Sequence, residues 1–148
     1  VMNRGHYYLV GNHENYDDMS TLRVDRIAHV TVLNERRKPL REIKGYQQQR
    51  TFNVSQYVKE HIYMFGGESI TVTFKAKRSI VNQILDWFDG NVEFTNITAD
   101  NVVCRVRVNH DAFKYWALQY MQSVKVLTPA SLVTEVKAAI EEGLHQYS

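Results

Sequence analysis

The chain has 148 residues, of which 44% are hydrophobic and 23% charged, and this composition excludes disordered and fibrous classes. The formal net charge of +2 is too small to indicate nucleic-acid binding from total charge alone. Cys104 is the one cysteine, so an internal disulfide is excluded and a reducing compartment is favoured. No apolar run is long enough to cross a membrane and no signal peptide is visible, so we expect a cytoplasmic protein.

The first part of the chain predicts strands. Residues 6–11 are aromatic and aliphatic, residues 12–20 have the composition of a hairpin loop, and residues 21–24 and 27–33 predict two further strands. These three strands would form one side of a small barrel. Because three strands leave unpaired edges, we expect missing upstream strands or a second chain to complete the barrel, and the chain to be cut from a longer protein.

Residues 35–50 form a basic segment, with six basic and two acidic side chains. A solvated linker with a basic face accounts for them; direct DNA contact through Arg36, Arg37 and Lys38 is the alternative. Asn53 followed by Gln56 predicts a capping box at the start of a helix. That helix would bury the apolar stripe Val54, Tyr57, Val58 and Ile62, and end at Gly66–Gly67.

From Glu68 onward the pattern is βαββαβ followed by one more helix. Alternating strands are predicted at 70–76, 92–97 and 102–108, with a last short strand at 124–127. Ser79 is expected to cap the first helix, which Gly90 ends, and Thr128–Pro129 to start a helix that runs to about Leu144. This order predicts a ferredoxin-like fold with an added C-terminal helix.

Two apolar patterns in this part indicate packing. Cys104 alternates with valines, which places it on the buried face of a strand and favours a structural thiol. One helical face is predicted to lie in the core rather than to form a recognition surface; it carries Phe113, Trp116, Ala117, Tyr120 and Met121.

Motifs for catalysis are missing from the sequence. It has no nucleophile elbow, no glycine-rich phosphate loop and no HExxH helix, and its six histidines show no metal-ligand spacing. His110–Asp111 is interpreted as a helix start rather than as half of a catalytic dyad. We therefore predict a protein that is not an enzyme, with no catalytic residues, no metal site and no cofactor.

The candidate ligand-binding residues are Tyr7, Tyr8, Arg23 and Arg26. Two guanidinium groups in one tight segment can hold phosphate or carboxylate, and an aromatic ring beside them can stack on a base. The alternative is structural: one tyrosine ring packs in the core and the other faces solvent. In that case Arg26 pairs with Asp25, Asp17 or Asp18 on the surface, which contributes little.

Four stretches together resemble the WYL-domain family of bacterial transcriptional regulators. They are residues 6–11 (HYYLVG), residues 22–27 (LRVDRI), residues 57–68 around MFGGE, and residues 113–129 with the helix that follows. The resemblance implies an α+β chain: a partial Sm-like or SH3-like barrel (1–34), a basic linker and connecting helix (35–67), and a ferredoxin-like C-terminal extension domain (68–148).

The same resemblance implies a function. The chain would be an effector-sensing and oligomerisation region, in which Tyr8, Arg23 and Arg26, supported by Tyr7, bind a nucleic-acid or nucleotide-like anion. A homodimer is expected, with promoter DNA bound through an absent N-terminal winged helix-turn-helix and no membrane contact. The alternative is a purely structural dimerisation module without a ligand. It is distinguished by whether Arg23 and Arg26 point into one concavity or into separate surface ion pairs.

Overall fold

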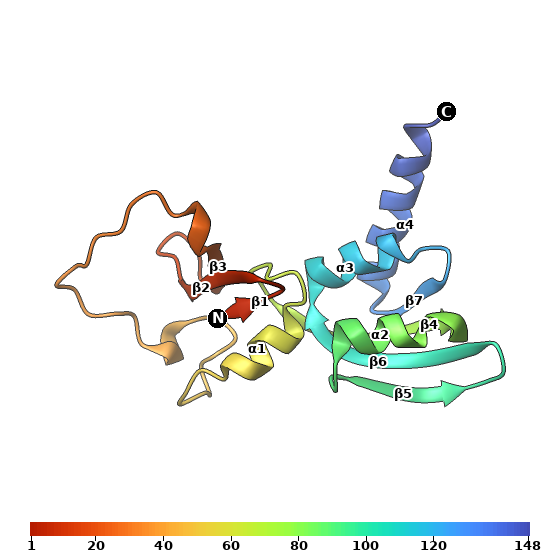
Figure 1. Cartoon of the computed structure of the whole chain (residues 1–148), viewed down its shortest axis with the longest axis horizontal. Coiled ribbons are helices and arrows are strands. Elements are labelled where there is room, and N and C mark those ends of the chain that lie inside the picture. The colour runs from red at the N-terminus through yellow and green to blue at the C-terminus, as the bar shows by residue number, and fades with distance from the viewer.

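The computed structural model describes residues 1–148 as a mixed α+β protein with two antiparallel sheets and four α-helices. Figure 1 shows two bodies, a small N-terminal sheet in red and a larger C-terminal sheet with its helices. The bodies meet at helix α1 (Val54–Glu60) and at the segment after it, residues 61–68. None of the helices is long and apolar enough to cross a membrane.

The N-terminal sheet has the order β1-β2-β3. Its strands are β1 (Met2–Asn3), β2 (His6–Asn12) and β3 (Met19–Arg23), so the strands expected near residues 6–11 and 21–24 are confirmed. Strand β1 was not predicted. It arises because Arg4 and Gly5 both have positive φ, 48° and 80°, as the central residues of a type I′ hairpin turn do.

The third predicted strand, residues 27–33, is wrong. After β3 the chain forms a 3₁₀ turn (Val24–Arg26), and residues 27–33 then run without regular structure. Val30 and Val32 are 77% and 91% exposed. A strand needs a neighbouring strand for its backbone hydrogen bonds, and here β3 is bonded only to β2. Because residues 27–33 have no such neighbour, their alternating pattern does not produce a strand. Figure 1 shows this stretch within a wide orange loop.

The connecting segment contains a 3₁₀ turn (Leu40–Glu42) and helix α1. The Asn53 cap is confirmed, because its side chain accepts from the backbone N–H of Gln56 at 3.0 Å. The reciprocal half of the capping box is wrong: the Gln56 side chain donates to Glu60 Oε1 at 2.6 Å instead. The helix also ends at Glu60, before the predicted Gly66–Gly67 stop.

A small core holds the N-terminal sheet against this connecting segment. It consists of four buried side chains, Met19, Ile43, Tyr57 and Met64, with Tyr8 and Val10 packed against it. Gly66 passes so close that a side chain on it would lie 3.0 Å from the carbonyl oxygen of Met19. The first body is therefore built partly from the connecting segment.

The C-terminal body confirms the predicted element order. It contains β4 (Ser69–Lys77), α2 (Val81–Phe88), β5 (Val92–Ile97), β6 (Asn101–Asn109), α3 (His110–Gln119), β7 (Val124–Thr128) and α4 (Ala130–His145). The strand order is β5-β6-β4-β7, and all neighbours are antiparallel. Helices α2 and α3 pack on one face, as aromatic contacts of Phe74 with Phe88 and Phe113 establish.

This body is built around a core of 17 buried residues, all of them its own except Ile62 of the connecting segment. The predicted packing of Phe113, Trp116 and Ala117 is confirmed, but Met121 is 52% exposed, because α3 ends two residues before it. Cys104 is fully buried on the helix-covered face, and burial raises the pKa of its thiol to about 11. It is a packing residue, as the alternation indicated.

Two helix caps differ from expectation. Ser79 lies inside a 3₁₀ turn (Arg78–Ile80) that precedes α2, and it makes no capping hydrogen bond. Thr128 makes no capping bond either, because it is the last residue of β7 and Pro129 occupies the N-cap position of α4. The predicted helix start at His110 is confirmed: Asn109 caps α3 by accepting from the backbone N–H of Ala112 at 3.0 Å.

Candidate ligand-binding site and the junction between the two bodies

Two of the four predicted binding residues lie side by side in the N-terminal sheet. Tyr8 on β2 is the direct cross-strand partner of Arg23 on β3. Opposite residues in an antiparallel pair project from the same face with their Cβ atoms about 5 Å apart. Tyr8 is half-buried against the small core, and the Arg23 side chain is 24% exposed. The fold therefore places a phenol ring next to a guanidinium group at a partly open surface.

Arg23 already has a partner. Its Nε and Nη2 donate to the two carboxylate oxygens of Asp25 at 3.0 and 2.6 Å, a bidentate pair. This contact raises the pKa of Arg23 and holds the pKa of Asp25 below its ordinary value. The surface pair anticipated for Asp25 is thus made with Arg23 and not with Arg26. An incoming anion would compete with Asp25 for the same guanidinium edge.

The other two predicted residues do not join this pair. Arg26 ends the 3₁₀ turn after β3; it is exposed and has no carboxylate within ion-pair distance. Tyr7 is 65% exposed and pairs with Met2, on the opposite face of β2 from Tyr8. A pocket of about 240 Å³ exists in the molecule, but none of the four residues lines it.

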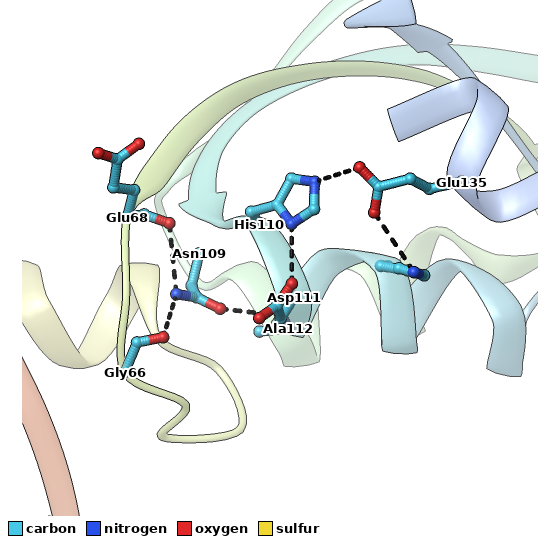
Figure 2. A network of polar contacts seen from close by, with 8 residues as sticks. Gly66, Glu68, Asn109, His110, Asp111, Ala112 and Glu135 are labelled. Atoms are coloured by element: carbon cyan, nitrogen blue, oxygen red, sulfur yellow. Dashed lines mark hydrogen bonds and ion pairs between the residues drawn. The ribbon is translucent and has the colours of Figure 1, made fainter. Parts of the chain in front are cut away.

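That pocket lies at the junction between the two bodies, where several hydrogen bonds to backbone carbonyl oxygens hold them together. The Thr21 hydroxyl donates to the carbonyl oxygen of Met64, and the Gly67 N–H donates to that of Met19 at 3.4 Å. Figure 2 shows Asn109 continuing this junction, because its Nδ2 donates to the carbonyl oxygens of Gly66 and Glu68 at 3.0 and 3.3 Å. Asn109 therefore both caps α3 and anchors the connecting segment.

A second polar group in Figure 2 joins α3 to α4. His110 lies between two carboxylates, with Nδ1 2.8 Å from Asp111 and Nε2 3.1 Å from Glu135. Lys114 donates to the second oxygen of Glu135 at 3.3 Å. The contacts with Glu135 connect α3 to α4. Nowhere in the chain do three or more His, Cys, Asp or Glu side chains gather in a way that could hold a metal ion.

Sequence reasoning missed the pocket at the junction. Its polar lining comes from segments far apart in the chain, including Asp18, Tyr57, Ser69 and Arg107. The sequence predicted Tyr57 as part of an apolar stripe, which does not indicate a polar pocket. The MFGGE stretch could have indicated the pocket, because its two glycines permit the close backbone approach that forms the junction.

The comparisons with known proteins agree with this division of the chain. Residues 1–32 match the family model of the WYL domain, and residues 67–144, more than half of the chain, match that of the WCX domain. No curated protein matches the chain significantly. WYL and WCX domains occur together in bacterial WYL-domain transcriptional regulators, where they are associated with sensing and regulation. The chain belongs to the WCX-domain family and, with its WYL match, carries the domain pair of these regulators.

Proposed function

We propose that this chain is the effector-sensing and oligomerisation region of a cytoplasmic bacterial transcriptional regulator and has no catalytic activity. In this proposal the N-terminal body is part of an Sm-like barrel, and the C-terminal body is a ferredoxin-like domain. The second assignment is supported by the strand order β5-β6-β4-β7, by helices α2 and α3 on one face, and by the added helix α4.

The proposed effector is an anionic, nucleic-acid or nucleotide-like molecule bound at the WYL part. The observation that carries this proposal is the direct cross-strand pairing of Tyr8 with Arg23. Arg23 and Arg26 would bind phosphate oxygens, and the Tyr8 ring would stack on a base, as in sequence-tolerant single-strand binders. Tyr7, on the other face, would support the strand rather than contact the same ligand.

Binding would act on the regulator through linkage. An effector that prefers one arrangement of a homodimer shifts the population toward it, and this changes how a DNA-binding domain outside this chain meets its promoter. The effector would displace Asp25 from Arg23 and thereby change the 3₁₀ turn that carries Arg26, which supplies the differential contact that linkage requires.

A scaffold without a ligand is the second candidate. The bidentate Arg23–Asp25 pair favours it, since the guanidinium of Arg23 is already paired with a carboxylate of the same chain. In this reading the WYL and WCX parts serve only to pair two copies of the regulator. A third candidate is direct DNA contact by Arg36, Arg37 and Lys38, all of which are exposed.

The test is binding of short single-stranded oligonucleotides and mononucleotides, followed by fluorescence anisotropy across a salt series. The wild type is compared with the double variant Arg23→Ala, Arg26→Ala and with the triple variant Arg36→Ala, Arg37→Ala, Lys38→Ala. Binding lost only in the double variant supports the sensor. Binding lost only in the triple variant supports DNA contact by the loop. No binding in any protein, with an intact dimer by light scattering, leaves the scaffold.

A further inference from the structure

The pocket at the junction draws on both bodies of the molecule. Asp18 and Met19 come from the N-terminal body, Lys44 and Tyr46 from the connecting segment, and the other lining residues include Tyr57 and Glu60 of α1, Ser69 of β4 and Arg107 of β6. Its volume is about 240 Å³ and most of its lining is polar. That volume is too small for an oligonucleotide and suits a small metabolite.

Two of the residues that line this pocket carry hydroxyl groups that are buried without a hydrogen-bond partner. They are the phenol oxygen of Tyr57 and Oγ of Ser69. The Tyr57 residue is only 3% exposed, and its ring is held by stacking on His61 with centroids 3.8 Å apart. A buried hydroxyl without a partner destabilises the fold, so most buried hydroxyls in proteins form a hydrogen bond to a protein group or to an ordered water. Neither hydroxyl has an acceptor within the protein.

The charged groups of the pocket are unevenly satisfied. Lys44 pairs with Glu68 at 2.5 Å, and Arg107 uses its Nε to pair with Glu60 at 3.3 Å. The two terminal amino groups of Arg107 make no ion pair or hydrogen bond within the protein. The Asp18 carboxylate likewise makes neither kind of contact. One charged side chain of each sign without a full set of protein partners therefore lines the pocket, and that of Arg107 is 56% exposed.

The phenols of the pocket stay protonated. Burial, followed by the charge of Glu60, raises the pKa of Tyr46 to about 12. Burial also raises the pKa of Tyr57 above its ordinary range, and the nearby Asp18 carboxylate adds to the effect. Neutral phenols are hydrogen-bond donors, so the donor-rich side of the pocket attracts an acceptor such as a carboxylate.

We propose that the junction pocket binds a small zwitterionic metabolite of the α-amino acid class. Its carboxylate accepts from the terminal N–H groups of Arg107 and from the hydroxyls of Tyr57 and Ser69, and its ammonium group contacts Asp18. A ligand with both charges can pair with Arg107 and with Asp18, whereas an amine or an acid alone leaves one of them without a partner.

Such a ligand would connect the two domains. Asp18 lies in the segment matched by the WYL family, and Ser69 and Arg107 lie in the segment matched by the WCX family. Occupancy therefore favours the arrangement in which the two bodies are in contact, a route by which a metabolite could bias the regulator. The pocket contains neither Tyr8 nor Arg23, so this proposal does not depend on nucleic-acid binding.

The test is a thermal-shift screen of the 148-residue chain with the proteinogenic amino acids at millimolar concentration, and calorimetry of each hit. The decarboxylated amine and the deaminated acid derived from each hit are measured beside it. We expect at least one amino acid to raise the melting temperature while both derivatives fail. Arg107→Gln and Asp18→Asn should each weaken binding roughly tenfold or more, as the loss of a charged hydrogen bond does.

The hydroxyl variants separate a binding role from a structural one. Tyr57→Phe and Ser69→Ala each remove an unpartnered buried group, so both should leave the free protein as stable or more stable while they weaken amino-acid binding. Arg105→Gln, on the same strand but outside this pocket, should bind normally. The proposal is overturned if no amino acid stabilises the wild type, if either single-charge derivative works equally well, or if the four pocket variants bind like the wild type.

Discussion

The two bodies of this chain differ most in how much apolar side chain each one buries. The C-terminal body assembles 17 buried residues around Phe74, Phe113 and Trp116, whereas the N-terminal body has four. Three of those four, Ile43, Tyr57 and Met64, come from the connecting segment, and only Met19 lies in the N-terminal sheet. The C-terminal body therefore supplies nearly all of its own core, with Ile62 as the exception, while the N-terminal sheet depends on the connecting segment.

This difference bears on where ligands are sensed. Regions with few buried contacts open locally at a lower free energy than a large core does, and ligand-responsive elements belong to that class. Both candidate ligand sites, Tyr8–Arg23 and the junction pocket, lie on or beside the small core. A ligand at either place acts on the part of the molecule that is easiest to reorganise.

The largest effect is expected from removing a ring in the large core. Phe113 is fully buried, so Phe113→Ala should lower the free energy of unfolding by about 3–5 kcal/mol. The midpoint of the main urea-unfolding transition should fall accordingly. Circular dichroism during urea unfolding measures this change. Tyr147→Ala, at a position 92% exposed, is the control and should unfold as the wild type does. A mild effect of Phe113→Ala would mean that the large core is not the stabilising unit.

A smaller and more local effect is expected in the small core. Ile43→Ala should cost about 2 kcal/mol, the lower end for such a change, because the half-exposed surroundings can collapse into the space. Amide hydrogen exchange should accelerate in β2 and β3 while β4 and β6 remain protected. Val32 is 91% exposed in the loop, so Val32→Ala should change the exchange rates of neither sheet. Equal acceleration in both sheets would contradict the division into two bodies.

The link between the bodies is tested at Asn109. Asn109→Ala removes the cap of α3 and both bonds to the connecting segment, and should cost about 1–2 kcal/mol. Asn109→Ser keeps a capping oxygen but cannot reach Gly66 and Glu68. It should recover part of the free energy of unfolding measured in denaturant. Amide hydrogen exchange at residues 64–68 should still be faster than in the wild type. If both variants behave alike, the junction bonds contribute nothing.

The two bodies also differ in how much of their structure could be predicted from the sequence. The element order of the C-terminal body was predictable because each element there carries its own periodicity, and the alternation around Cys104 and the stripe of Phe113 and Trp116 reflect one core. The N-terminal body was less predictable, since residues 27–33 alternate like a strand yet have no neighbour to bond. Tyr8 and Arg23 could be named, but their register could not, and neither could the pairing of Arg23 with Asp25. The paired glycines of the MFGGE stretch could have indicated a close backbone approach, but the residues that line the pocket could not be named, because they come from segments far apart in the chain.

Acidification should weaken the junction before the large core. His61 is 3% exposed, and burial lowers the pKa of its ring below the ordinary value near 6.5. The unfolded chain therefore takes up a proton at higher pH than the folded one, so stability falls as the pH drops from above 6.5 toward the folded pKa. Exchange at residues 57–67 should accelerate over that window, and His61→Gln should flatten the response. An unchanged pH profile in the variant would assign the effect to another group.

The smallest effect on stability, and the most informative for function, is expected from Asp25→Ala. Both Arg23 and Asp25 lie at the surface, and exposed ion pairs contribute little, so urea unfolding should be unchanged within error. The variant releases the whole guanidinium of Arg23 next to Tyr8, and an anion no longer has to displace a carboxylate. Oligonucleotide affinity should therefore rise in Asp25→Ala and fall in Arg23→Ala. If Asp25→Ala binds no better than the wild type while Arg23→Ala loses stability instead, the pair is a structural clamp on the turn and the scaffold interpretation is the better one.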